Sequence, residues 1–187
     1  MKIIVVLLSL VTLCSGCSST APTHFIVNTA PIMSLNTLTN KTINIEVTDN
    51  RARQDILLRT NNGKKSYLAA QLPTTTFIKQ GLITSFGQDS AVGFSTTSHR
   101  LLHINIEKMA IKLDQSTIFY ETQSLVMLAV TITNGTKTIN KTFKRQGTSK
   151  GPLTADIAVL EQEFNQLIAQ LFNDISQDTQ VIQYLEI

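Results

Sequence analysis

Residues 102–113 read LHINIEKMAIKL, and this stretch decides the fold. Apolar and polar residues alternate through its first half with a period of two, which is the pattern of a strand that buries one face. The apolar phase then slips by one residue, and such a slip turns the other face inward unless the strand carries a bulge or bend. We therefore expect such a feature near Lys108. The residues predicted to face the core are Leu102, Ile104, Ile106, Met109, Ile111 and Leu113.

The following segment predicts a β-hairpin. One strand runs to Thr133, and a second runs from Thr136 to about Lys144, with Asn134-Gly135 between them. Asn-Gly is the preferred two-residue loop of a type I′ turn because both of its positions need a positive φ. This loop sets the register of the two strands and brings apolar residues together on one side of the ribbon. The expected apolar pairs are Val130 with Ile139 and Val126 with Phe143.

Two segments have the pattern of helices. The first lies within residues 73–87 with Thr74 as its N-terminal cap, and the second follows Pro152 with Thr154 as its cap. Gly81 weakens the first helix by up to about 1 kcal/mol relative to alanine. The second helix is long and amphipathic, so one side packs against the protein and the other faces water. Its apolar positions are Ile157, Leu160, Phe164, Leu167, Ile168, Leu171, Phe172 and Ile175.

The C-terminal segment from Ser176 to Ile187 continues past this helix with further apolar residues. Such a tail is too apolar for a solvated terminus. It either packs back on the domain or docks on a partner, and covering exposed apolar surface is the commoner use. The sequence favours the first alternative and leaves the second open.

The order of the elements predicts an α+β fold. A strand over residues 43–47 opens the domain, and a helix, three or more antiparallel strands and a final helix follow it. We expect an antiparallel sheet with two main helices packed on one face. A single domain over residues 41–187 contains all of these segments and is of ordinary size.

The first sixteen residues have the composition of an export signal. An uncharged apolar run from Ile3 to Leu13 follows Lys2, and the small residues Ser15 and Gly16 come after it. This run is too short to span the hydrocarbon core of a bilayer as a helix, which needs about 20 residues. Residues 1–16 are therefore interpreted as a signal peptide that is removed.

The cysteines of the chain, Cys14 and Cys17, lie at the end of this signal. The stretch from Leu13 to Cys17 resembles the lipobox of bacterial lipoproteins, in which a lipid-bearing cysteine follows a small-small cleavage site. A lipobox usually has leucine three residues before that cysteine, whereas this chain has Cys14 there and Leu13 one position earlier. The resemblance implies cleavage between Gly16 and Cys17, lipid attachment at Cys17, and a mature protein without a free thiol. Ser18 at the next position implies sorting to the periplasmic face of the outer membrane.

Residues 17–40 are predicted to be a lipidated N-terminus followed by a flexible tether. Serine, threonine, asparagine and alanine dominate this segment, and Pro22 and Pro31 interrupt regular structure. A short apolar island over residues 25–27 favours one short edge strand at most. Because two or more acyl chains hold a protein on a bilayer almost permanently, membrane lipid is the partner that this segment implies.

Charge and motifs exclude several functions. The formal net charge of +3 falls by one when Lys2 is removed, and the remaining basic residues are scattered, so nucleic-acid binding is set aside. The sequence has no Gly-x-Ser-x-Gly motif, no phosphate-binding glycine-rich loop and no His-Glu-x-x-His motif. We therefore predict no catalytic residue and no cofactor. His99 and His103 stand four apart, which would suit a metal only on a helix, and no third ligand is evident, so no metal site is predicted.

Asp49, Arg51 and Arg53 form a charged cluster just past the first strand of the domain. One interpretation is a binding edge that contacts a partner. The other is a local carboxylate–guanidinium pair that closes the turn, and it is favoured because it needs no partner. The cluster is nevertheless the candidate for any partner contact made by the domain itself.

Three features follow one another along the chain: residues 43–47 leading into Asp49-x-Arg51, the hairpin at Asn134-Gly135, and the ending Ser176-Gln177-Asp178-Thr179 after the amphipathic helix. Together with the lipobox, their order and spacing resemble the YajG-type lipoproteins of Gram-negative bacteria. The resemblance spans nearly the whole chain. It implies an outer-membrane lipoprotein without an established activity.

The leading hypothesis is a non-catalytic periplasmic binding or accessory module of the outer membrane, with an envelope protein or polymer as its partner. A second hypothesis is a hydrolase or transferase acting on envelope material, which a cleft with converging carboxylates or a His–carboxylate pair would favour. A third is a scaffold that self-associates. The oligomeric state is left open.

Overall fold

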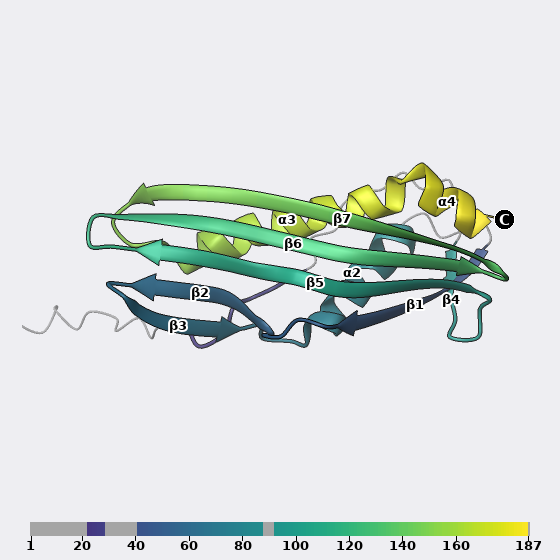
Figure 1. Cartoon of the computed structure of the whole chain (residues 1–187), viewed down its shortest axis with the longest axis horizontal. Helices are drawn as coiled ribbons and strands as arrows, with labels where there is room; N and C mark the ends of the chain where they lie inside the picture. The colour runs from purple at the N-terminus through teal and green to yellow at the C-terminus, as the bar shows by residue number, and fades with distance from the viewer. Residues whose placement is uncertain (1–21, 29–40, 88–91, 187) are drawn as a thin grey trace, which may run out of the picture.

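The computed structural model describes residues 22–28, 41–87 and 92–186, in which seven strands form a curled sheet with three helices (Figure 1). The predicted α+β class is confirmed. Across the described ranges, no helix is both long enough and apolar enough to cross a membrane. The elements are β1 (Lys41–Asp49), β2 (Asp55–Asn61), β3 (Lys64–Ala69), α2 (Thr74–Gly87), β4 (Val92–Phe94), β5 (Arg100–Gln115), β6 (Phe119–Asn134), β7 (Lys137–Pro152), α3 (Ile157–Gln177) and α4 (Thr179–Glu186).

β5 is the central strand of the sheet. β6 pairs antiparallel with β5 along its length, and β7 pairs antiparallel with β6. Along the other edge of β5, β1 and then β2 run parallel to it, opposite Leu101–Ile106 and Ile111–Gln115 respectively (Figure 1). β3 pairs antiparallel with β2, and β4 pairs parallel with β1. The sheet is therefore mixed rather than purely antiparallel as expected, because α2 carries the chain back across the sheet before β5 begins.

The irregularity expected near Lys108 is confirmed as a β-bulge. The pairing of β5 with β6 shifts between Ile106 and Lys108, so Glu107 is the extra residue. The bulge restores one buried face along the whole strand. Every residue that the alternation predicted to face the core, on either side of the slip, is buried.

The hairpin around Asn134-Gly135 is present, but its turn and register differ from the prediction. Asn134 pairs with Lys137, so the two loop residues are Gly135 and Thr136. Gly135 has a φ of +60° while Thr136 keeps a negative φ, which fits a type II′ turn rather than type I′. The register moves by two residues, which leaves the same face inward because the side-chain period is two. Instead of Val130 with Ile139 and Val126 with Phe143, the pairs are Ile132 with Ile139 and Leu128 with Phe143.

A second hairpin with an Asn-Gly loop, which was not predicted, joins β2 to β3. Asn61 pairs with Lys64, which leaves Asn62 and Gly63 as the loop. Their φ values are +48° and +79°. Two positive φ values are what a type I′ turn requires. Asn62-Gly63 therefore forms the type I′ turn that was predicted for Asn134-Gly135.

The helices pack on one face of the sheet and enclose the core with it (Figure 1). Asp156, not Thr154, caps α3, because its carboxylate accepts the N–H of Ala158 at 2.9 Å. Thr74 begins α2 as expected, but its hydroxyl donates to Asp49 instead of capping the helix. The N-terminal caps predicted at Thr74 and Thr154 are therefore both wrong.

Gly81 of α2 is required by the packing of two helices. A Cβ at this position would lie 2.1 Å from Cε2 of Phe172 in α3, much closer than carbon atoms approach. Phe172 also contacts Phe77, with ring centroids 6.1 Å apart. The residue that weakens α2 locally thus allows α3 to pack closely against it.

The C-terminal tail packs back on the domain, as the favoured alternative expected. Its helix α4 buries Val181 and Leu185. Asp178 accepts the N–H groups of Gln180 and Val181 at the start of α4 and forms an ion pair with Lys141 of β7 at 2.5 Å. Burial alone would raise the pKa of Asp178, but the hydrogen bonds from Lys141 and from these N–H groups hold that pKa below its ordinary value.

Part of the predicted tether is bound to the domain. Phe25 is fully buried and packs edge-on against Phe164 of α3, with ring centroids 5.9 Å apart. Its N–H donates to the carbonyl oxygen of Ala69 at 2.9 Å, so the expected edge strand is reduced to a single β-bridge. We call residues 22–28 the N-terminal strap. The rest of the predicted tether lies outside the described residues.

Candidate functional site

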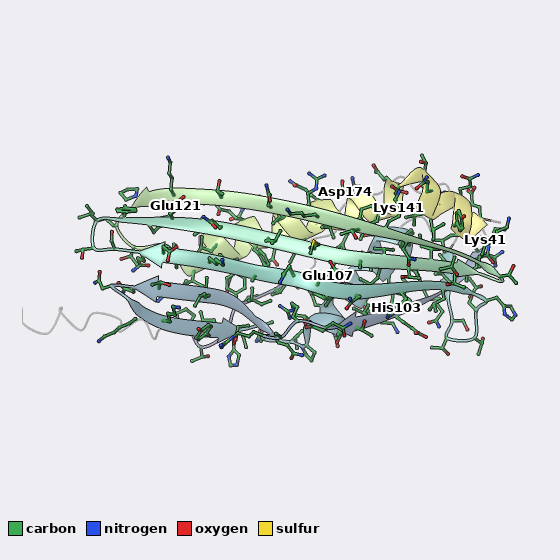
Figure 2. All side chains as sticks on the ribbon, viewed as in Figure 1. Lys41, His103, Glu107, Glu121, Lys141 and Asp174 are labelled. Carbon is green, nitrogen blue, oxygen red and sulfur yellow. The ribbon has the colours of Figure 1, made fainter. Side chains whose placement is uncertain are left out.

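No described segment of the chain covers the face of the sheet opposite the helices. Side chains that alternate with the core residues of β5, β6 and β7 point away from the helices and are partly or fully exposed (Figure 2). We call this surface the open face. Its central rows, each crossing three strands, are Lys108–Met127–Lys144, Ala110–Leu125–Gln146 and Lys112–Gln123–Thr148.

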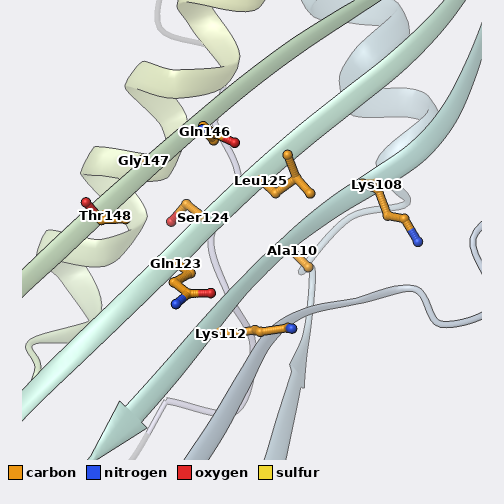
Figure 3. A pocket seen from close by; sticks show the side chains of 9 residues that line it. All are labelled: Lys108, Ala110, Lys112, Gln123, Ser124, Leu125, Gln146, Gly147 and Thr148. Carbon is orange, nitrogen blue, oxygen red and sulfur yellow. The ribbon is translucent and has the colours of Figure 1, made fainter.

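A pocket of about 630 Å³ lies on the open face (Figure 3). The side chains of Ala110 and Leu125 are its apolar part, and Lys108 and Lys112 extend beside them from β5. Amide and hydroxyl groups of β6 and β7 complete the lining. Pockets that hold small ligands have volumes of about 300–1,000 Å³, so this one is large enough for a ligand or for a segment of a polymer.

The bulge at Glu107 positions the two lysines of this pocket. Before the bulge the even-numbered residues of β5 face the core, and after it the odd-numbered ones do. Without the phase change, Lys108 and Lys112 would point into the apolar core. The irregularity read from the sequence therefore orients the lysines as well as the core residues.

The middle of the open face is positively charged. Lys108, Lys112 and Lys144 form no ion pair within the described part of the chain, and Glu107 at the bulge is not paired with them. The other lysine and arginine of β7 that lie nearby, Lys141 and Arg145, point to the helix side and pair with Asp178 and Asp174. The middle of the open face thus carries three lysines without an ion pair, beside amides and an apolar floor, and the carboxylates of this face lie one row further, in Asp114–Glu121–Lys150.

The lining of the pocket suits binding. Its outward-facing polar side chains are lysine, glutamine and threonine, and no histidine, cysteine, aspartate or glutamate lines it. Among the described residues, no group of three or more histidine, cysteine, aspartate or glutamate side chains is placed to hold a metal ion. Lysines and amides recognise anions and hydroxyl groups.

The two histidines singled out by their spacing lie outside the pocket. His99 precedes β5 and His103 lies within it, so the four-residue spacing falls on extended chain rather than on a helix. His103 is opposite Glu46 in the pairing of β1 with β5, yet its Nε2 lies 3.2 Å from the hydroxyl oxygen of Thr48. The carboxylate of Glu46 accepts from Asn44 instead.

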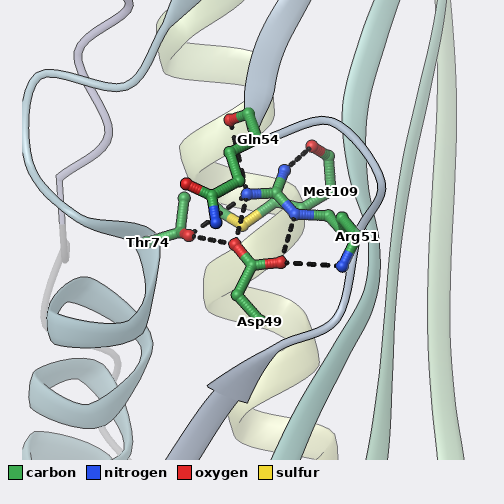
Figure 4. Close-up of polar contacts among 5 residues, drawn as sticks. All are labelled: Asp49, Arg51, Gln54, Thr74 and Met109. Atoms are coloured by element: carbon green, nitrogen blue, oxygen red, sulfur yellow. Dashed lines mark hydrogen bonds and ion pairs between the residues drawn. The ribbon is translucent and has the colours of Figure 1, made fainter.

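Asp49 and Arg51 form a buried hydrogen-bonded pair (Figure 4). The guanidinium donates from Nε and Nη2 to the two carboxylate oxygens at 2.8 and 2.7 Å, and from Nη1 to the carbonyl oxygen of Met109 at 2.7 Å. The hydroxyl of Thr74 donates to Asp49 at 2.7 Å and accepts from Arg51 at 3.1 Å. Both charged side chains are only 5% exposed, so they join β1, β5 and α2 rather than offering a surface to a partner.

Burial alone would raise the pKa of Asp49, but the hydrogen bonds from Arg51 and Thr74, with the charge of Arg51, hold it below its ordinary value. The carboxyl of Asp49 is therefore ionised near neutral pH. Arg53 is the exposed member of the cluster, with 63% of its side chain accessible. It pairs with Asp55 at 3.0 Å and lies over the ring of Tyr67. Of the three residues, it alone is placed to meet a partner.

The remaining predicted site residues, Gly16 and Cys17, lie outside the described residues. The pocket was not predictable from the sequence. The alternation in residues 102–113 does indicate which side chains of β5 face outward, but the site forms only when β6 and β7 supply their own. Pairing Lys112 with Gln123 and Thr148 depends on the turn between β5 and β6, which carries no Asn-Gly or other strong hairpin signal.

The model of a family described as uncharacterized lipoprotein matches residues 29–186. Among solved structures, a protein of the DUF330 family from Xanthomonas campestris superposes with a TM-score of 0.60 at 15% identity, covering 87% of this chain and 97% of that chain. A minor lipoprotein from Acinetobacter baumannii gives a TM-score of 0.37 at 10% identity, covering 80% and 92%. At 15% identity, the likeness to the DUF330 protein is a likeness of fold alone. No curated protein matches the chain significantly.

Proposed function

The chain belongs to the YajG-type family of uncharacterized lipoproteins, and from this premise we propose that it is a lipid-anchored accessory module that binds an anionic envelope polymer on its open face. In this proposal residues 1–16 are removed and Cys17 carries the lipid. The anchor lies in the outer membrane, the domain lies in the periplasm, and the module catalyses no reaction.

The unpaired lysines of the open face carry the proposal. Lys108 and Lys112 line a pocket of about 630 Å³, and Lys144 lies in the same row as Lys108. None of the three forms an ion pair within the described residues. An anionic ligand is the charge complement of such a surface. The lipid-anchored location proposed for the protein would place this surface among anionic envelope polymers.

The polar groups of the pocket favour a saccharide polymer with carboxylates. Gln123 and Gln146 offer amide donors and acceptors to sugar hydroxyls, and Thr148 offers a hydroxyl. Ala110 and Leu125 form an apolar surface on which the C–H face of a sugar ring could lie. The lysines would meet the carboxylates.

The free edge of the sheet supports a binding module over a self-associating scaffold. β7 pairs with β6 on one side, and no strand of the described chain pairs with its other side. Two copies joined through this edge would bring like charges together, which destabilises strand pairing. The basic residues of β7 that form no ion pair within the described chain are Lys137, Lys144 and Lys150, and β7 has no acidic residue.

Titration with purified soluble peptidoglycan fragments tests the binding proposal. The double variant Lys108→Glu with Lys112→Glu should weaken the binding at least about tenfold, which corresponds to about 1.4 kcal/mol. The matched control, Lys64→Glu with Lys79→Glu, changes the net charge equally on exposed lysines outside the pocket and should bind as the wild type does. No binding by the wild type, or equal loss in both variants, would contradict the proposal.

Metabolic labelling with a fatty acid tests the anchor separately. The wild-type protein should incorporate the label and fractionate with outer membranes, whereas Cys17→Ser should carry no lipid. Cys14→Ser should still incorporate it, because that residue belongs to the segment removed. Labelling of the Cys17→Ser variant combined with loss in Cys14→Ser would place the processing site elsewhere.

A further inference from the structure

Three large apolar side chains are exposed together at one end of the sheet. Ile118 and Phe119, at the turn from β5 to β6, are 73% and 53% exposed, and Leu153, just past β7, is 66% exposed. Phe119 pairs with Pro152, and the N–H of Leu153 donates to the carbonyl oxygen of Ile118 at 2.9 Å. The three residues are therefore neighbours, at the left end of the sheet in Figure 1. We call them the apolar tip.

The apolar tip is held in place by hydrogen bonds. The N–H of Ser116 donates to the carbonyl oxygen of Phe119 at 2.9 Å, and the hydroxyl oxygen of Ser116 accepts the N–H of Phe119 at 3.2 Å. Leu153 has a φ of +62°, in the left-handed region that bulky residues rarely adopt. The hydrogen-bonded turn and the strained Leu153 thus present apolar surface to the solvent. Backbone outliers are common at functional sites, and exposed apolar patches mark surfaces that meet a partner or a membrane.

The N-terminal strap runs toward this same end. The N–H of Asn28 donates to Asn165 at 3.0 Å, and the N–H of Ile26 donates to Glu161 at 2.7 Å. Toward its N-terminus, the strap therefore runs toward the start of α3. The helix begins at Ile157, and a short connection joins it to Leu153 of the apolar tip. The strap leads the chain toward the apolar tip as it approaches the N-terminus.

The proposed lipid lies only a few residues beyond the strap. Whatever path they take, the residues between Cys17 and Pro22 reach about 18 Å at most, because an extended chain advances about 3.6 Å per residue. An anchor of that length keeps the membrane surface near the end of the domain from which the strap leaves. The exposed apolar side chains are found at that end.

We propose that the apolar tip inserts Ile118, Phe119 and Leu153 into the lipid surface that holds the anchor, so that the tip end of the domain contacts the bilayer. This inference rests on the proposed lipid attachment at Cys17. Apolar side chains buried in the interfacial region add to the hold of a lipid anchor and fix the orientation of the domain. The long axis of β5, β6 and β7 would then rise from the membrane, with the open face accessible from the periplasm.

Fluorescence quenching by lipid tests the proposal on the lipidated full-length protein. Single cysteines are introduced by Ile118→Cys or, as a matched control, Thr136→Cys at the other end of β6, about 50 Å away for a strand of this length. Each variant is labelled with an environment-sensitive dye and placed in phosphatidylethanolamine–phosphatidylglycerol vesicles that contain nitroxide-bearing lipid. The dye at position 118 should shift to the blue and be quenched, and the dye at position 136 should do neither. Phe119→Cys provides the same measurement if Ile118→Cys does not fold.

A second set of variants separates insertion from anchoring. In the Ile118→Cys background, Phe119→Asp with Leu153→Asn should abolish the quenching while the protein still floats with the vesicles. Flotation with equal, unquenched emission at both positions would overturn the insertion but leave the proposed lipid attachment intact. A protein that does not float would overturn both. A dye at position 118 that is shielded in native envelopes, but not in vesicles, would mean that the tip docks on a protein, and this also overturns the proposal.

Discussion

The guanidinium of Arg51 donates from Nη1 to the carbonyl oxygen of Met109 at 2.7 Å, in the gap between the two strands that line one edge of β5. The pairing with β1 ends at Ile106, and the pairing with β2 begins at Ile111. The carbonyl of Met109 lies between them, where no strand of the described residues pairs with this edge of β5. The arginine side chain supplies a donor to this carbonyl, so the Met109 oxygen remains hydrogen-bonded in the interruption.

Arg51→Ala should lower the free energy of unfolding by about 3–5 kcal/mol, because it leaves the carboxylate of Asp49 buried without its partner. Urea denaturation measures this. Arg53→Ala is the matched control, since Arg53 pairs with Asp55 at the surface and exposed pairs contribute about 1 kcal/mol or less. Equal losses in the two variants would contradict the structural role assigned to Arg51.

The stability contributed by Asp49 should depend on pH. Because its pKa is lower in the folded protein, this contribution is fully present above the ordinary aspartate pKa of about 3.9 and is lost as the pH falls through the folded-state pKa. At pH 7 the variant Asp49→Asn should be clearly less stable than the wild type, and the difference should shrink as the pH falls below about 4. Urea denaturation at pH 7, 5 and 3 measures the difference. A constant gap across this range would be inconsistent with the lowered pKa.

Gly81→Ala should destabilise the protein even though alanine is the better helix former. The added Cβ would lie 2.1 Å from the ring of Phe172, and overpacking costs about 1–3 kcal/mol, whereas the gain in helix propensity is at most about 1 kcal/mol. Thermal denaturation measures the result. Phe172→Leu in the Gly81→Ala background should recover part of the loss relative to the sum of the single changes. Strict additivity of the two substitutions would argue against the contact.

Gly135→Val should lower the free energy of unfolding by about 1–2 kcal/mol, because Gly135 has a φ of +60° and a β-branched residue is strained there. A Cβ at this position meets no other atom within 4 Å, so the cost comes from the backbone alone. Thr136→Val is the control, since that loop residue keeps a negative φ and tolerates β-branching. If Thr136→Val is the more harmful change, the loop has been placed incorrectly.

Local patterns predicted much of the fold because the information lies within a few residues. Alternation in residues 102–113 located both the strand and its bulge, and the amphipathic period located α3. The cap of α3 lies two residues from the predicted one, and helix ends are not defined that closely by local preferences. The turn type at Gly135 depends on the register of the two strands, which local preferences also do not distinguish. The parallel pairing of β1 and β2 with β5 was missed because long-range pairing leaves no local signal.

In the candidate site, too, local features were predicted and long-range contacts were not. The sequence placed Asp49 and Arg51 together and favoured a local pair, but their burial comes from α2 and β5, which are distant in the chain. The pocket of the open face needs Lys112, Gln123 and Thr148 from three strands in register. No motif contains these residues together, so the pocket could be found only after the sheet was assembled.

Phe25 is expected to contribute strongly to stability although it lies outside the domain boundary inferred from sequence. Its ring is fully buried against Phe164, and its backbone is bonded to Ala69, so Phe25→Ala should lower the free energy of unfolding by about 3–5 kcal/mol. Ile26→Ala is the matched control, because that neighbouring side chain is exposed and should contribute little. Urea denaturation of the full chain and of both variants checks the prediction. An unchanged midpoint for Phe25→Ala would mean that the strap is not held on the domain in solution, and the path that leads the chain toward the apolar tip would no longer be defined.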